Sequence, residues 1–94
     1  MSAFNKDIVK LHLETKGHEV LSVREDSPDY FDDEVTIITR ARVAGKVWSF
    51  WVQEDGHCGA CIGMNCIYHS DDQPSWMVAL DNVLDQMEKA RHHA

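Results

Sequence analysis

The sequence has few of the residues that interrupt regular structure, with two Pro and five Gly among 94 residues. It also lacks any apolar run near the ~18 to 20 residues that span a bilayer, and its N-terminal residues lack the apolar segment of a signal peptide. We therefore expect no contact with a membrane and a location in the cytoplasm. Hydrophobic residues make up 44% of the chain and include three Trp and three Phe, which predicts a packed fold rather than disorder.

Cysteine is scarce and odd in number. The three cysteines all lie between residues 58 and 66. An odd count within so short a stretch is a poor framework for disulfides. We expect reduced thiols or a metal site instead, as is usual for cytoplasmic proteins.

Positive charge is also scarce, since 9 Lys and Arg face 16 Asp and Glu for a formal charge of −7. No Lys or Arg occurs between Val47 and Glu88. Contacts with phosphates require clustered Lys and Arg, so this charge argues against direct binding of nucleic acid.

The negative charge is concentrated in an acidic segment, residues 25–34, where six of ten positions are Asp or Glu. Carboxylates set around two aromatic residues suit docking on a basic protein surface. The alternative is a solvated loop that keeps the protein in solution. The candidate partner-binding residues of this segment are Asp26, Asp29, Tyr30, Phe31, Asp32, Asp33 and Glu34.

The chain is predicted to form a single α+β domain over residues 1–94, because no repeat or linker divides it. Hydrophobic periodicity predicts an N-terminal helix over about residues 3–16, capped by Ser2, and a C-terminal helix from Trp76. Alternating apolar residues predict strands over residues 18–25, 35–43, 47–52 and 60–68. The expected architecture is a three- to four-stranded antiparallel meander packed against both helices in two layers.

Both faces of the predicted strand over residues 47–52 carry an aromatic residue, with Phe50 on one face and Trp51 on the other. Two helices can cover only one face of the sheet. Trp51, beside Ile38, is therefore a candidate contact for a partner protein or for a second copy of the chain in a homodimer. The alternative is that residues 30–31 fold over this face.

Cys and His residues follow this strand at short spacings. Cys58 and Cys61 have the C-x2-C spacing that brings two thiolates to one zinc ion, and Cys66 and His69 repeat the two-residue gap. These four residues are the candidate metal ligands of a small zinc-binding structural module. One alternative is that Cys61 and Cys66 are buried apolar side chains of a strand, and another is redox chemistry at the C-x-x-C pair.

Catalytic motifs are missing from the sequence. It contains no G-x-S-x-G, no H-E-x-x-H and no glycine-rich phosphate loop. A domain of this size also has little room for a substrate pocket beside its core. We expect a protein that is not an enzyme.

The order helix, antiparallel meander, helix is similar to that of double-stranded RNA-binding domains. Those domains carry a basic cluster at the start of the last helix, whereas residues 71–77 here are acidic and apolar. The resemblance therefore concerns topology and implies no RNA binding.

We expect a small acidic interaction module that binds a larger protein and masks a basic, nucleic-acid-binding surface, as an inhibitor or regulator. Acidic single domains without catalytic motifs are a common form of phage or mobile-element inhibitors of host nucleic-acid-handling or defence machinery. This analogy of size and charge places the chain in the host cytoplasm. The alternative function is the zinc-binding module, and zinc is the one cofactor considered.

Overall fold

The computed structural model describes residues 4–26 and 35–92. Its elements are α1 (Lys6–Thr15), β1 (Glu19–Asp26), β2 (Thr36–Val43), β3 (Lys46–Gln53), β4 (His57–Ile62), β5 (Asn65–Ser70) and α2 (Trp76–His92). The strands form one antiparallel sheet in chain order, β1-β2-β3-β4-β5. The predicted α+β architecture is confirmed, with five strands in place of three to four.

The extra strand arises from a turn that the sequence pattern does not indicate. The sequence predicts a single strand over residues 60–68, whereas the chain forms β4 from His57, reverses at Gly63-Met64 and returns as β5. Gly63 has a φ of +60°, a left-handed conformation that glycine adopts without steric cost. The apolar alternation of this region therefore crosses a turn and does not mark one strand.

Helix α1 begins later than the sequence predicts, because Asn5 is its N-cap. The side-chain oxygen of Asn5 accepts a hydrogen bond from the backbone N–H of Ile8, at 3.0 Å. This bond satisfies one of the first-turn amides that lack a partner within the helix. The predicted cap, Ser2, lies outside the described residues.

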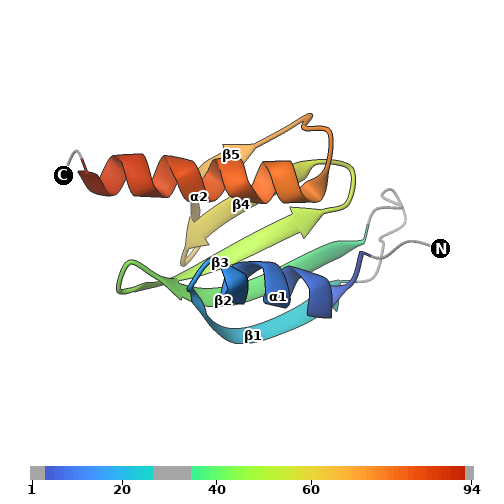
Figure 1. Cartoon of the computed structure of the whole chain (residues 1–94), viewed down its shortest axis with the longest axis horizontal. Coiled ribbons are helices and arrows are strands. Elements are labelled where there is room, and N and C mark those ends of the chain that lie inside the picture. Colours follow the sequence, from blue (N-terminus) through green and yellow to red (C-terminus); the bar gives the residue numbers. More distant parts are fainter. Residues whose placement is uncertain (1–3, 27–34, 93–94) are drawn as a thin grey trace.

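Both helices lie on one face of the sheet, α1 over β1 and β2 and α2 over β4 and β5 (Figure 1). The core fills the space between the helices and this face. Its largest fully buried apolar side chains are Phe50, Leu13, Ile37, Leu80, Val9, Val52 and Val83. Burying one such side chain stabilises a fold by about 1.5 to 3 kcal/mol, so this face provides most of the hydrophobic stabilisation. Within the described ranges, neither helix is long and apolar enough to cross a membrane.

The turn between β2 and β3 determines which residues face away from the helices. Ala44 and Gly45 have φ values of 55° and 83°, as in the two-residue turns that suit the twist of antiparallel strands. In the resulting register Ile38 lies opposite Trp51. Since side chains alternate along a strand and Phe50 faces the core, Ile38 and Trp51 belong to the outer face of the sheet. We use this name for the residues of β1–β5 that point away from both helices.

Alanine substitution should separate the two faces of β3. Phe50→Ala removes a fully buried side chain and is expected to lower the free energy of unfolding by about 3 to 5 kcal/mol. Trp51→Ala should cost about 2 kcal/mol or less, because Trp51 lies outside the core between helices and sheet. Urea unfolding followed by circular dichroism measures both values. Equal losses for the two variants would place Trp51 in a second core.

Candidate functional sites

The outer face carries Trp51 in a fixed position. Its indole lies over Gly59 of β4, so closely that a Cβ atom on residue 59 would come within 2.2 Å of the indole nitrogen. This contact leaves Trp51 half-buried, as are Ile38 opposite it and Val47 on the same strand. Ile38 and Trp51 form an apolar pair across β2 and β3, and Val47 lies on the same face beyond the Arg40–Ser49 pair.

Arginine side chains lie beside these apolar side chains on the outer face. Arg40 and Arg42 are exposed on β2, where they alternate with buried residues. Arg42 Nη1 lies 3.3 Å from Glu19 Oε1 of β1, and Arg24 of β1 pairs with Asp26. The outer face thus combines a half-buried Trp with adjacent Arg side chains, two residue types that are enriched at protein-binding surfaces.

The acidic segment joins the end of β1 to the start of β2. Within it Glu25 and Asp26 belong to β1. The other predicted contact residues, Asp29, Tyr30, Phe31, Asp32, Asp33 and Glu34, lie outside the described residues. The same holds for the alternative in which residues 30–31 cover the outer face.

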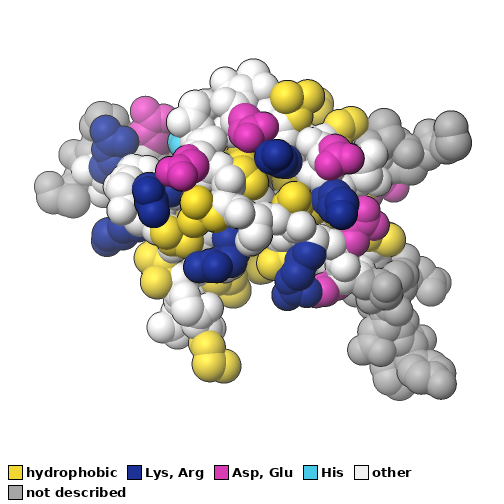
Figure 2. Space-filling model, turned by 90° about the horizontal axis from the view of Figure 1, so that it is seen from below, with side chains coloured by type: hydrophobic (Ala, Val, Ile, Leu, Met, Phe, Trp, Pro, Cys, Tyr) yellow, Lys and Arg dark blue, Asp and Glu magenta, His cyan; other side chains and the backbone are white. Residues whose placement is uncertain are grey.

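Most of the Lys and Arg residues, but as many Asp and Glu, lie on the side of the molecule formed by α1, β1 and β2. Of the nine Lys and Arg residues, Lys89 and Arg91 alone follow Val47 in the sequence. Figure 2 views this side and shows Lys and Arg side chains spread across it, with Asp and Glu between them. Strands β4 and β5 carry neither Lys or Arg nor Asp or Glu, so the charged side chains of the sheet lie on β1, β2 and β3.

Two of the predicted zinc ligands are joined to each other. Cys61 and Cys66 form a disulfide between β4 and β5, in contrast to the reduced thiols expected from the sequence. The reason is the unexpected turn at Gly63-Met64, which places Cys61 opposite Cys66 in the register of the hairpin. Sulfur atoms in a disulfide are not the thiolates that zinc binds.

The other two predicted ligands lie apart from this pair. Cys58 is three residues before Cys61 on one strand, so their side chains point to opposite faces of the sheet. Cys58 is fully buried in the core, and burial raises the pKa of its thiol far above the usual value. His69 is exposed on β5. Among the described residues no three Cys, His, Asp or Glu side chains are grouped closely enough to hold a metal ion.

A chain of ion pairs links β4 to the segment before α2. His57 Nδ1 lies 3.0 Å from Asp71 Oδ1, and His69 Nδ1 lies 3.8 Å from Asp71 Oδ2. The carboxylates of Asp55 and Asp72 lie 3.6 and 3.9 Å from His57 Nε2. The pKa of His57 lies above its ordinary value, mainly because of the hydrogen bond to Asp71. Burial opposes this shift, and the nearby carboxylate charges add to it.

The tip of the β4–β5 hairpin exposes apolar side chains. Met64 is 99% exposed, and Ile62 and Ile67 are exposed beside it. The disulfide holds the two strands together directly behind this tip. The apolar pattern of the sequence predicts that these residues lie within a strand, and it gives no sign of an exposed apolar tip.

A groove of about 630 Å³ lies between the C-terminal half of α2 and the β2–β3 turn. Trp48 of β3 and Tyr68 of β5 line it, with ring centroids 5.6 Å apart. Leu84 and Met87 of α2 add apolar surface, and Lys46 follows the turn. We call this site the α2 groove.

The α2 groove results from the unequal lengths of the helices. α1 has 10 residues and α2 has 17, which correspond to about 15 and 26 Å at a rise of 1.5 Å per residue. α2 therefore continues beyond the end of α1, above the β2–β3 turn (Figure 1). No spacing in the sequence marks this site, because its lining residues come from separate elements that only the fold brings together.

Comparison of the chain with protein-family models, with curated proteins and with solved structures finds no match.

The cysteine arrangement predicts how the thiols react. Under native conditions Cys58 should resist a thiol reagent, because the thiolate is the reactive form and burial disfavours it. Denatured but unreduced protein should expose one reactive thiol, and its mass should be lower than that of reduced protein by two hydrogen atoms. Protein purified without a metal-affinity tag should melt identically with and without a strong chelator. One equivalent of zinc together with a chelator-sensitive melting temperature would instead establish the four-ligand zinc site.

Asp71→Asn is expected to lower the pKa of His57 towards its ordinary value, since it removes the main interaction that favours the protonated ring. A raised pKa in the folded state stabilises the protein below the unfolded pKa of about 6.5, and this stabilisation disappears as the pH rises through the folded pKa. The variant should therefore lose more stability at about pH 5.5 than at about pH 8.5. NMR titration of the His57 ring and urea unfolding at both pH values test this.

Asp72→Asn is the matched control. Asp72 is 93% exposed and lies farther from His57 than Asp71 does. Asn also tolerates the positive φ of 58° at this position. An equal fall of the His57 pKa in both variants would contradict a specific role for Asp71.

Proposed function

We propose that the protein is a small binding module that occupies a surface of a larger partner protein through the outer face of its sheet. The main supporting observation is that Trp51 lies on a face that neither helix covers and is held in place by its contact with Gly59. Aromatic side chains that are already fixed before binding lose little conformational entropy in an interface, and they often supply much of its energy. This function requires no catalysis.

The margin of the outer face is suited to orienting the partner. Arg40 and Arg42 are exposed on β2 and follow Ile38 along the same face of that strand. Arg42 is half-exposed in its ion pair with Glu19, so the pair has little stabilising effect in water and can be exchanged for a contact with a partner. Charged groups at the margin of an interface contribute mainly to specificity and to the rate of association.

The acidic segment would make the second contact. Its six carboxylates, together with the net charge of −7, favour a partner with a basic surface. Proteins that bind nucleic acids carry such surfaces, and covering one would inhibit or regulate the partner. An origin in a phage or mobile element, acting in the cytoplasm of the host, rests on the analogy of size and charge alone.

Affinity capture tests the role of the outer face. Immobilised wild-type protein should retain a partner from a host extract that Trp51→Ala does not retain. Leu11→Ala is the control, because Leu11 is 61% exposed on α1 and therefore lies on the helix side of the molecule. Retention of the same partner by all three proteins would exclude the outer face as the contact, and a dimer of wild-type protein that Trp51→Ala dissociates would identify the partner as a second copy.

Reversal of three charges tests the acidic segment. Asp29, Asp32 and Asp33 changed together to Lys should slow association with the captured partner by about tenfold or more at low salt, because steering by opposite charges is lost. The difference should shrink as salt is added, since charges are screened over about 8 to 10 Å near physiological ionic strength. Stopped-flow or surface-based kinetics at two salt concentrations measure the effect. Unchanged rates would leave the segment with a role in solubility.

A further inference from the structure

The α2 groove has the size found in ligand sites, and its lining combines apolar and aromatic side chains with charged ones. Known small-molecule sites have volumes of about 300 to 1,000 Å³ and are lined mainly by apolar and aromatic side chains with a few polar groups. The groove, at about 630 Å³, falls within this range. Tyr68 and Leu84 are partly exposed along it, whereas Trp48, tilted against Tyr68, and Met87 belong to the core and are only 8% and 7% exposed. A flat apolar group is the chemistry that such a surface accommodates.

The carboxylates of α2 that border the groove are already matched by bases. Asp81 Oδ1 lies 2.7 Å from His12 Nε2 and 3.7 Å from Lys16 Nζ. Asp85 Oδ2 lies 3.1 Å from Lys89 Nζ, and Glu88 interacts electrostatically with His18. Lys16 and Lys89 thus offset the charges of Asp81 and Asp85, whereas Glu88 is near only the imidazole of His18.

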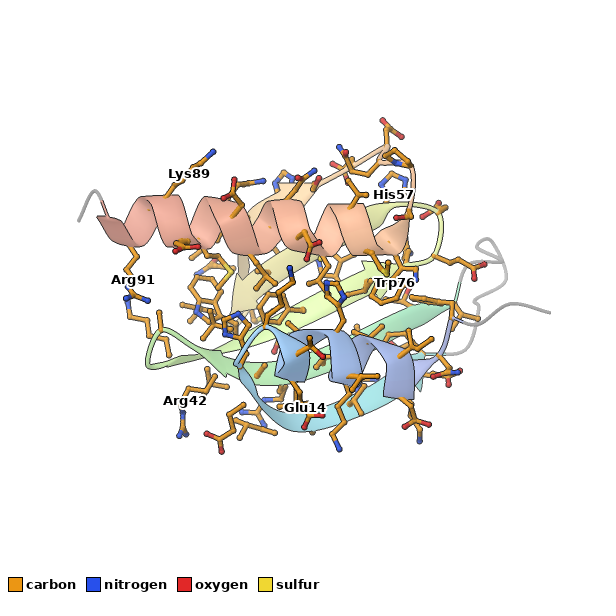
Figure 3. All side chains as sticks on the ribbon, viewed as in Figure 1. Glu14, Arg42, His57, Trp76, Lys89 and Arg91 are labelled. Atoms are coloured by element: carbon orange, nitrogen blue, oxygen red, sulfur yellow. A yellow bond between two sulfur atoms is a disulfide. The ribbon has the colours of Figure 1, made fainter. Side chains whose placement is uncertain are left out.

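Two cations at the other end of the groove lack such a match. Lys46 and Arg91 are both exposed, and neither makes an ion pair with another described residue. Arg91 points from α2 towards the β2–β3 turn, the turn that Lys46 follows, whereas Lys89 points away from the sheet (Figure 3). His18 does not add a third charge near neutral pH, because burial lowers its pKa. The groove is thus lined by these two positive charges together with Trp48 and Tyr68.

We propose that the α2 groove binds a small aromatic monoanion, with its ring against Trp48 and Tyr68 and its carboxylate at Lys46 and Arg91. Charge-assisted hydrogen bonds from Lys and Arg to a carboxylate are stronger than neutral ones, so both parts of the ligand contribute. A polyanion is disfavoured, since Glu88 borders the same groove and the protein as a whole is negative. The site lies on the helix side of the sheet and is independent of the function proposed for the outer face.

Binding of 2-naphthoate and of its neutral primary amide tests this proposal. In NMR titrations 2-naphthoate should shift the backbone amides of Trp48, Tyr68 and Leu84, and it should bind at least about fivefold more tightly than the amide, because only the acid interacts with the two cations. In the double variant Lys46→Gln/Arg91→Gln the acid should bind no more tightly than the amide. The affinity of the amide should be the same in wild type and variant, which also shows that the variant is folded.

Lys89→Gln is the matched control, because Lys89 is a cation on the same helix that lies outside the groove and pairs with Asp85. This variant should retain the preference for the acid. Three results would each overturn the proposal: equal affinities of the acid and the amide in wild type, an unchanged preference in the double variant, or shifts centred on Trp51. Absence of saturable binding of 2-naphthoate at millimolar concentration would overturn it as well.

Discussion

Phe50 and Trp51 are adjacent on the central strand and point to opposite faces of the sheet, and the layered structure depends on this alternation. Phe50 is fully buried under the helices, whereas Trp51 packs across the outer face onto Gly59. A shift of β3 by one residue would exchange the two side chains and expose the core residues of the strand. The turn at Ala44-Gly45 prevents this shift, because its positive φ values suit a loop of two residues and so fix Ile38 opposite Trp51.

The position of the α2 groove follows from how the two helices contact each other. Trp76, at the start of α2, packs against Phe4 and His12, with ring centroids 5.7 and 5.4 Å apart. Asp81, one turn later, bonds to His12. These contacts join the helices near the start of α2, as the position of Trp76 between them shows (Figure 3). The C-terminal half of α2 extends past α1, so α1 does not cover this part of the sheet and Tyr68 remains partly exposed beside the buried Trp48.

Sequence patterns predict the elements whose two faces differ in polarity. β2 is predictable because Ile37, Thr39 and Ala41 are buried in alternation with more exposed residues, and α2 because its apolar residues recur at helical spacing. The β4–β5 hairpin is not predictable in this way, because its apolar residues do not alternate with polar ones according to burial. Its tip exposes Ile62 and Met64, so hydrophobicity there does not report burial.

The candidate sites are predictable to different degrees. Trp51 can be assigned to the outer face, since strand alternation and the number of helices suffice for that inference. Pairing of Cys61 with Cys66 cannot be inferred, because it depends on a register that an unrecognised turn sets. The α2 groove cannot be inferred either, since Lys46 and Arg91 come together through the relative lengths of two helices and not through any local spacing.

The sheet also determines which cysteines pair. Closing so short a loop by a disulfide stabilises a protein by about 2 kcal/mol in the chain-entropy model, so the main effect of the Cys61–Cys66 bond is local, at the hairpin with the exposed Met64. Exchange of partners would require Cys58 to attack this bond as a thiolate. Cys58 points to the core face of β4, where it pairs in register with Val52 of β3, so its thiol is out of reach of the disulfide. Burial also raises the pKa of this thiol, which keeps it protonated. An odd number of cysteines is therefore compatible with one defined disulfide, because the alternation of β4 separates the third cysteine from the other two.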